Sequence, residues 1–98
     1  MIFIIDMANV IATIRIMPVS PEVDLSAVLK KAGEIIGKKA EYIKHEIEPV
    51  AFGIKALMLY VKADESKGSL DPLCEEIQSK IKEVQGAEVI DVRREIEL

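Results

Sequence analysis

The side chains that most often carry catalysis are scarce and scattered in this sequence. His45 is the only histidine and Cys74 the only cysteine. A zinc site needs several histidine or cysteine ligands at short spacings, so neither residue predicts a metal centre. Cys74 lies near the start of a predicted helix, where a reactive thiol is sometimes found, but no base adjoins it in the sequence. We therefore interpret it as a half-buried, unreactive cysteine.

Other kinds of chemistry lack their usual residues as well. The sequence contains no glycine-rich loop that could hold a phosphate. The net charge of −4 and the pI near 5.0 argue against nucleic acid as a direct ligand, because phosphate contacts need a basic surface. Two Phe and two Tyr are too few for an RNA-binding sheet built on stacked aromatics. We expect no catalytic residue, no metal and no cofactor, and so a protein that is not an enzyme.

One short stretch could act by contact instead of by catalysis: Pro49, Val50, Ala51, Phe52 and Gly53. Proline fixes the backbone and removes a hydrogen-bond donor, whereas glycine turns where other residues cannot. Phe52 stands between them, in a segment too short and too bent to bury a large ring easily. Two interpretations follow. The ring is either a plug in the core or a probe that enters a partner protein, and the two differ in its exposure.

Length and composition suit one globular domain. Ninety-eight residues can bury a single core, and a chain that is 50% hydrophobic and 31% charged is not disordered. A lone cysteine excludes an internal disulfide, and no apolar run approaches the roughly 20 residues of a membrane helix. The first residues lack the basic end of a signal peptide. We expect a cytoplasmic domain over residues 7–98, preceded by an extension at residues 1–6, with no membrane partner.

Hydrophobic periodicity predicts six elements. They are a strand at 9–17, a helix between 20 and 37, a strand at 40–48, a strand at 53–61, a helix from about 70 to 86 and a strand at 89–94. The strand at 53–61 is apolar on both faces, which is typical of a central strand. In the strand at 40–48 we expect Ile43 and Ile47 to face the core, and in the last strand Ile90 and Val92.

This order predicts an α+β, ferredoxin-like βαββαβ sandwich: a four-stranded antiparallel sheet with two helices on one face. The first and third strands should be central. The other face of the sheet should carry Ile11, Thr13, Arg15, Ile54, Met58 and Tyr60. That face is either a docking patch, through which the protein dimerises as an interaction or ligand-sensing module, or a shielded surface. Nothing in the sequence specifies an oligomeric state.

Several segments resemble archaeal elongation factor 1-beta, a guanine-nucleotide exchange domain family. Residues 7–18 (MANVIATIRIMP) and 21–25 (PEVDL) are similar to its opening, and residues 91–94 (DVRR) to its ending. The most specific match is residues 48–57 (EPVAFGIKAL), which also resemble the exchange domain of the eukaryotic factor. The resemblance extends from residue 7 to about residue 94, nearly the whole chain.

The resemblance implies a ferredoxin-like fold and a protein of translation elongation, an exchange factor for the GTPase elongation factor 1-alpha. It implies that Phe52 enters the GTPase near its switch region and that Pro49, Val50, Ala51 and Gly53 form the loop presenting it. The chain departs from the eukaryotic pattern at its end, where Glu97 occupies the place of a lysine that disturbs the magnesium site. The candidates for a replacement cation are Lys55, Arg93 and Arg94.

Overall fold

The computed structural model describes residues 9–64 and 70–94. The predicted extension at residues 1–6 and Glu97 lie outside the described residues. The elements, in chain order, are β1 (Asn9–Pro18), α1 (Leu25–Ile36), β2 (Ala40–Ala51), β3 (Ile54–Asp64), α2 (Asp71–Lys80) and β4 (Val84–Arg94). Neither of the helices described is long and apolar enough to cross a membrane.

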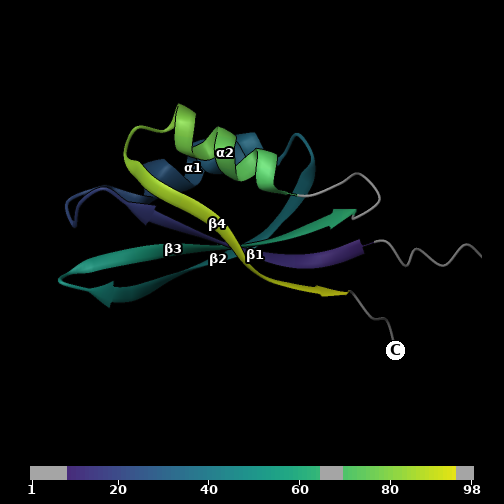
Figure 1. Cartoon of the computed structure of the whole chain (residues 1–98), viewed down its shortest axis with the longest axis horizontal. Helices are drawn as coiled ribbons and strands as arrows, with labels where there is room; N and C mark the ends of the chain where they lie inside the picture. The colour runs from purple at the N-terminus through teal and green to yellow at the C-terminus, as the bar shows by residue number, and fades with distance from the viewer. Residues whose placement is uncertain (1–8, 65–69, 95–98) are drawn as a thin grey trace, which may run out of the picture.

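The four strands form one sheet in the order β2-β3-β1-β4, and every neighbouring pair is antiparallel. Both helices lie on the same side of this sheet (Figure 1). We call the covered side the helix face and the other side the open face. The ferredoxin-like fold predicted from the sequence is confirmed, including the central positions of β1 and β3.

The start of α1 shows how local sequence fixes an element. The carboxylate of Asp24 accepts a hydrogen bond from the backbone N–H of Ser26 at 3.0 Å, which caps the first turn. The buried residues of α1 recur at helical spacing along one side: Val28, Ala32, Ile35 and Ile36. The capped start and the apolar stripe together place α1 against the sheet.

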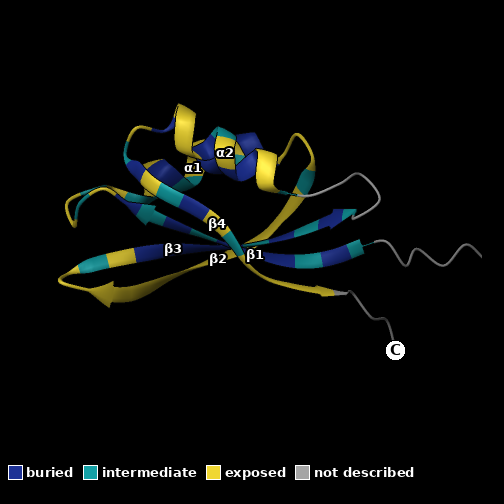
Figure 2. Ribbon diagram, viewed as in Figure 1, coloured by how far each residue is buried: buried dark blue, intermediate teal, exposed yellow. Residues whose placement is uncertain are grey.

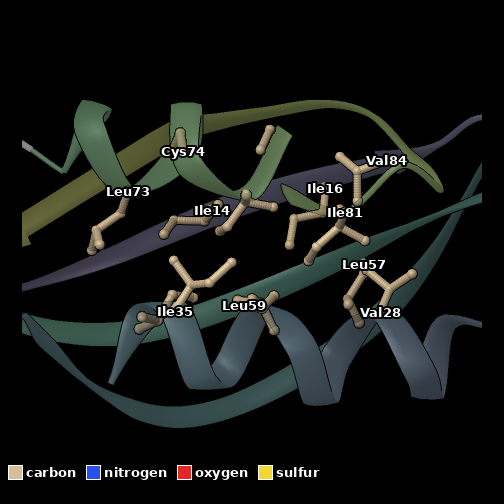
Figure 3. Close-up of a cluster of buried hydrophobic side chains, with 14 of the residues drawn as sticks. Ile14, Ile16, Val28, Ile35, Leu57, Leu59, Leu73, Cys74, Ile81 and Val84 are labelled. Carbon is tan, nitrogen blue, oxygen red and sulfur yellow. The ribbon is translucent and has the colours of Figure 1, made fainter. Parts of the chain in front are cut away.

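Alternate residues of the two central strands provide the floor of the core. Ile14 and Ile16 of β1 lie on the helix face beside Leu57 and Leu59 of β3, and all four are fully buried (Figure 3). The helices contribute the opposing layer, which includes Val28, Ile35, Leu73 and Ile77. Since the strand period is two, this burial fixes the register of the whole sheet.

The second helix is shorter than predicted, and the last strand is longer. We predicted a helix ending at Gly86, but α2 ends at Lys80 and β4 begins at Val84. Ile81 and Val84 follow Ile77 at spacings of four and three, which imitates a helical stripe. Both residues are buried, yet Val84 pairs with Pro18 of β1. The apolar pattern of residues 81–86 fits either a helix or a strand, and pairing with β1 makes the segment from Val84 a strand.

Ile90 and Val92 are not buried in the core, contrary to prediction. The register between β1 and β4 shifts where Thr13 pairs with Asp91 and Ile14 with Val89, so Ile90 is left out of the pairing. Ile90 is 42% exposed and Val92 is 54% exposed. The β-bulge explains the exposure of Ile90, whereas Val92 lies opposite buried Ala12 on the helix face but outside the buried cluster.

The prediction that Ile43 and Ile47 face the core is also wrong. Ile47 lies on the helix face but is 51% exposed, and Ile43 is exposed as well. The buried cluster contains no residue of β2, and only Ala40 packs at its margin. The two helices cover β1 and β3 and leave the edge strand uncovered, as the exposed colour along β2 shows (Figure 2).

An ion-pair cluster joins the two helices at their surface. Glu76 of α2 accepts hydrogen bonds on Oε2 from Nζ of Lys38, at 2.8 Å, and from Nζ of Lys80, at 2.9 Å. These two bonds lower the pKa of Glu76 to about 2. Lys38 follows the end of α1, so the cluster links the segment after α1 to α2.

We expect Leu59→Ala to lower the free energy of unfolding by about 2–5 kcal/mol, because Leu59 is fully buried and its truncation leaves a cavity in the core. Ile90→Ala removes a side chain that is already 42% exposed, so its loss should stay within about 0.5 kcal/mol. Urea unfolding of both variants measures the two values. A loss below about 0.5 kcal/mol at Leu59 would mean that the faces of β3 are assigned wrongly.

Glu76→Gln should remove a pH-dependent part of the stability. The pKa of Glu76 is lowered in the folded protein, so its contribution is present above the ordinary glutamate pKa of about 4.3 and is lost as pH falls toward 2. The difference in stability between wild type and variant should be constant above about pH 5 and shrink below it. Unfolding at a series of pH values tests this. A difference that does not change with pH would contradict the assignment.

Candidate functional site

The β2–β3 hairpin turns through only two residues, and both have positive φ. Ala51 ends β2 and Ile54 begins β3, while Phe52 has φ 55° and Gly53 has φ 79°. Positive φ at both central residues is the signature of the type I′ turn, whose twist matches that of the two strands. Asn-Gly is the usual sequence there. Phe52 is the only non-glycine residue of the described chain with positive φ, and it costs roughly 1–2 kcal/mol in that conformation.

The ring of Phe52 projects into solvent. The residue is 97% exposed, in the turn between β2 and β3. The tip of this hairpin lies away from the helices (Figure 1). The interpretation of Phe52 as a core plug is therefore wrong, and the exposure expected of a probe is observed. Strained backbone in a folded protein persists where the surroundings impose it, and such positions cluster at functional sites.

The neighbours of Phe52 hold the turn but leave it accessible. Pro49 pairs with Lys55 and Ala51 with Ile54, and an irregularity between these pairs puts Val50 out of register. Val50 is half exposed, and Pro49, Ala51 and Gly53 are exposed too. The strands thus support an apolar tip that buries none of its own side chains.

Two residues beside the tip were not predicted. The loop at 19–24 between β1 and α1 lies against the turn: a methyl group built on Gly53 would be 4.0 Å from Cβ of Pro21. Val19 is half exposed, and its backbone N–H donates to the carbonyl of Glu83 at 2.9 Å. Because β1 runs antiparallel to β3, the loop after β1 must reach the end where β3 begins. That topological signal could have indicated Val19 and Pro21.

The structure separates the candidate cations into two groups. Lys55 follows the turn, is exposed and makes no ion pair within the described part of the chain. Arg93 lies at the other end of the sheet, where Ile11 pairs with both Arg93 and Lys62. From Ile54 to Lys62 the strand extends about 26 Å at 3.3 Å per residue.

The two arginines near the end of β4 are adjacent in the sheet register. The guanidinium Nε of Arg93 donates to Oδ2 of Asp91 at 3.0 Å, and the arginine side chain remains exposed. Arg94 pairs with Val10, one step farther from the hairpin than Arg93. Lys55 near the tip and Arg93 at the opposite end can therefore contact only well-separated parts of a partner.

Cys74 and His45, the two other candidate reactive residues, are accounted for by burial and by a hydrogen bond. Cys74 is buried in the core, and burial together with nearby Asp71 raises the pKa of its thiol to about 11. A thiol of that pKa is protonated at neutral pH, which suits an unreactive cysteine. His45 Nδ1 lies 2.6 Å from the hydroxyl oxygen of Tyr42, in a hydrogen bond. Within residues 9–64 and 70–94, no group of three His, Cys, Asp or Glu side chains could hold a metal ion.

The open face is not an exposed apolar patch. Met58 is buried although no helix covers it, and its neighbours on the adjoining strands are Arg15 and Glu46. The hydroxyl of Tyr60 donates to Oε1 of Glu46 at 2.9 Å, which raises the pKa of Tyr60, and Nζ of Lys44 lies 4.8 Å from the tyrosine ring centre. This face is shielded by polar side chains of its own strands, which removes the main argument for dimerisation through it.

An ion pair extends the polar surface toward β4. Arg15 pairs with Glu88, the residue opposite it in the sheet register. Charged side chains therefore lie over both sides of the buried centre of the open face. The exposed apolar residues lie elsewhere, at the hairpin tip and along the edge strands.

Comparison with known proteins adds a family to this geometry. Residues 11–94 match the model of the EF-1 guanine nucleotide exchange domain. The chain is 43% identical over 88 residues to elongation factor 1-beta of Methanothermobacter thermautotrophicus, with 90% of this chain and 98% of the relative covered. It is 41% identical over 80 residues to elongation factor 1-beta of Nanoarchaeum equitans, with 82% and 98% covered.

A third relative, elongation factor 1-beta of Pyrococcus furiosus, is 40% identical over 87 residues, with 88% of this chain and 94% of the relative covered. The matched regions run from β1 to the end of β4 and include the whole hairpin. On this likeness over nearly its full length, the chain belongs to the EF-1 guanine nucleotide exchange domain family.

Proposed function

We propose that this protein is a cytoplasmic exchange factor that promotes GDP release from the GTPase elongation factor 1-alpha. One observation carries the proposal: a chain of an exchange-domain family holds a 97%-exposed aromatic ring on a strained two-residue turn. An exposed phenylalanine gains nothing for folding in that position, whereas an aromatic ring inserted into a partner's pocket often dominates an interface.

The hairpin suits this role because it is stiff. A disordered aromatic would lose conformational freedom on binding, and each side chain immobilised at an interface costs about 0.5–1.5 kcal/mol. Here the type I′ turn and its flanking strands fix the backbone of Phe52 before any encounter. Pro49, Val50, Ala51 and Gly53 then act as the support that presents the ring.

Exchange requires differential binding and no bond-making. GTPases hold GDP through loop amides, a lysine and a magnesium ion that bridges the phosphates. A partner that binds best when the magnesium site and switch region are displaced stabilises the nucleotide-free form. By linkage, the nucleotide weakens the exchange factor's binding by the same factor. The factor thus lowers the barrier to release, and the excess of GTP over GDP sets the direction.

The basic residues supply the electrostatic part of this proposal. Lys55 follows the turn that holds Phe52 and has no acidic partner among the described residues, so its charge is available to a partner. Arg93 and Arg94 would contact the GTPase at a second point, at the other end of the sheet. A positive charge near the magnesium site would oppose binding of the metal.

Phe52→Ala should slow GDP release by tenfold or more while leaving folding intact. Tenfold corresponds to about 1.4 kcal/mol, less than the roughly 2 kcal/mol that an aromatic anchor contributes. Thermal melting should stay close to that of wild type, because the ring makes no core contact. The measurement is release of fluorescent GDP from purified elongation factor 1-alpha, with melting recorded on the same preparation.

The matched control is Ile90→Ala, which removes an exposed apolar side chain from the opposite edge of the sheet and should not change exchange. If Phe52→Ala exchanges like wild type, the ring is not the contact that matters. If wild type itself fails to accelerate release at stoichiometric amounts, the proposed function is wrong.

Phe52→Asn should increase stability and decrease exchange together. Asparagine tolerates positive φ, and Asn-Gly is the preferred type I′ pair, so the variant should gain up to about 1 kcal/mol in free energy of unfolding. It should lose at least tenfold in exchange, as alanine does. Urea unfolding and GDP release measure the two effects. A variant less stable than wild type would contradict the strain assigned to this turn. Phe52→Ala is the control, because it removes the ring without the stabilisation expected from asparagine at positive φ.

A further inference from the structure

A row of side chains on β2 faces the helix side of the sheet without being covered. Tyr42 lies opposite Val61, His45 opposite Leu59 and Ile47 opposite Leu57. Because those three partners of β3 are buried under the helices, their neighbours on β2 point to the same face. We call Tyr42, His45 and Ile47 the β2 strip.

The β2 strip carries two large hydrophobic side chains, Tyr42 and Ile47, where an edge strand is usually charged. Tyr42 is 40% exposed and Ile47 is 51% exposed. Edge strands generally carry charges that prevent unwanted pairing, and β2 does so on its other face, with Lys44, Glu46 and Glu48. The two faces of one strand therefore differ: the polar one adjoins the shielded open face, and the apolar one is left bare.

A β-bulge organises the strip. The register shifts between Tyr42 and Lys44, which puts residues 42 and 45 on the same face although they are three apart. Their rings stack with centroids 6.3 Å apart and planes 29° from parallel, and the hydrogen bond between them is 2.6 Å long. The tyrosine ring is thus fixed before any partner arrives, which lowers the entropy lost on binding.

The strip leads directly to the hairpin tip. From Ile47 to Ala51 the strand extends about 13 Å at 3.3 Å per residue, with half-exposed Val50 on the way, and Phe52 follows directly. A specific interface buries about 800 Å² on each partner, whereas one aromatic side chain provides only about 150–250 Å². A protein that binds Phe52 must therefore cover more of the surface around it, and the β2 strip lies on the strand that leads into the tip.

We propose that the β2 strip is part of the surface that binds the GTPase, so that recognition follows the helix side of β2 as well as the turn. This inference rests on the proposed function and names further residues of the same site. The open face is the less suitable extension, because Arg15, Glu46 and Glu88 shield it with charge. In this arrangement Ile47 and Tyr42 contribute affinity, and Phe52 remains the anchor.

The test compares Ile47→Ala with Val92→Ala. Val92 is 54% exposed, like Ile47, but lies on the opposite edge strand. Release of fluorescent GDP is measured against increasing concentrations of each purified full-length variant. We expect Ile47→Ala to raise the concentration needed for half-maximal acceleration at least fivefold, with the maximal rate and the melting temperature close to wild type. Val92→Ala should leave all three unchanged.

The remaining outcomes overturn the inference in distinguishable ways. If the Ile47 and Val92 variants behave alike while Phe52→Ala still slows release, the strip is not in the interface but the proposed function stands. If wild type does not accelerate release, the proposed function fails and the inference fails with it. If sedimentation shows wild type as a dimer that Ile47→Ala dissociates, with exchange unaffected, the strip binds a second copy of this chain.

Discussion

Burial of β1 and β3 beneath the two helices is the constraint on which the rest of the structure depends. Ile14 and Leu59 lie side by side at the centre of the core, and neither can move to the other face without exposing the whole apolar set of its strand. That register fixes where β3 begins and so where the hairpin turns. The position of Phe52, in the turn before β3, is a consequence of packing at Leu59, seven residues farther along the chain.

The core also determines which strands are left uncovered. Two helices of 12 and 10 residues cover the central strands and the first half of β4, where Val84 and Ala87 belong to the buried cluster, whereas β2 lies outside it. The hairpin tip is the extreme case, since it projects past the helices altogether. A turn that combines backbone strain with a bare aromatic ring lowers stability, and strained positions of this kind cluster at functional sites.

Charge follows the same division of the surface. On the open face, Arg15, Glu46 and Glu88 form ion pairs and hydrogen bonds around a buried centre. The apolar centre of this face is therefore already covered by polar side chains of the same sheet. The exposed apolar side chains lie instead at the hairpin end and along the edges. A small exchange factor needs no catalytic residue, because its effect comes from the difference in affinity between two states of a partner. A stiff hairpin that places a few side chains in fixed positions is sufficient to produce such a difference in affinity.

Alternation and helix-start signals in the sequence determined the element order, the central strands and the helix-covered face, and they marked Phe52 as a residue held on a stiff turn. Only the tertiary structure decided whether its ring is buried. Sequence periodicity also misplaced Ile47 and Ile90, because it reports that a side is apolar but not whether a helix covers it or a bulge shifts it. Coverage and register depend on residues far apart in the chain, so no local pattern contains them.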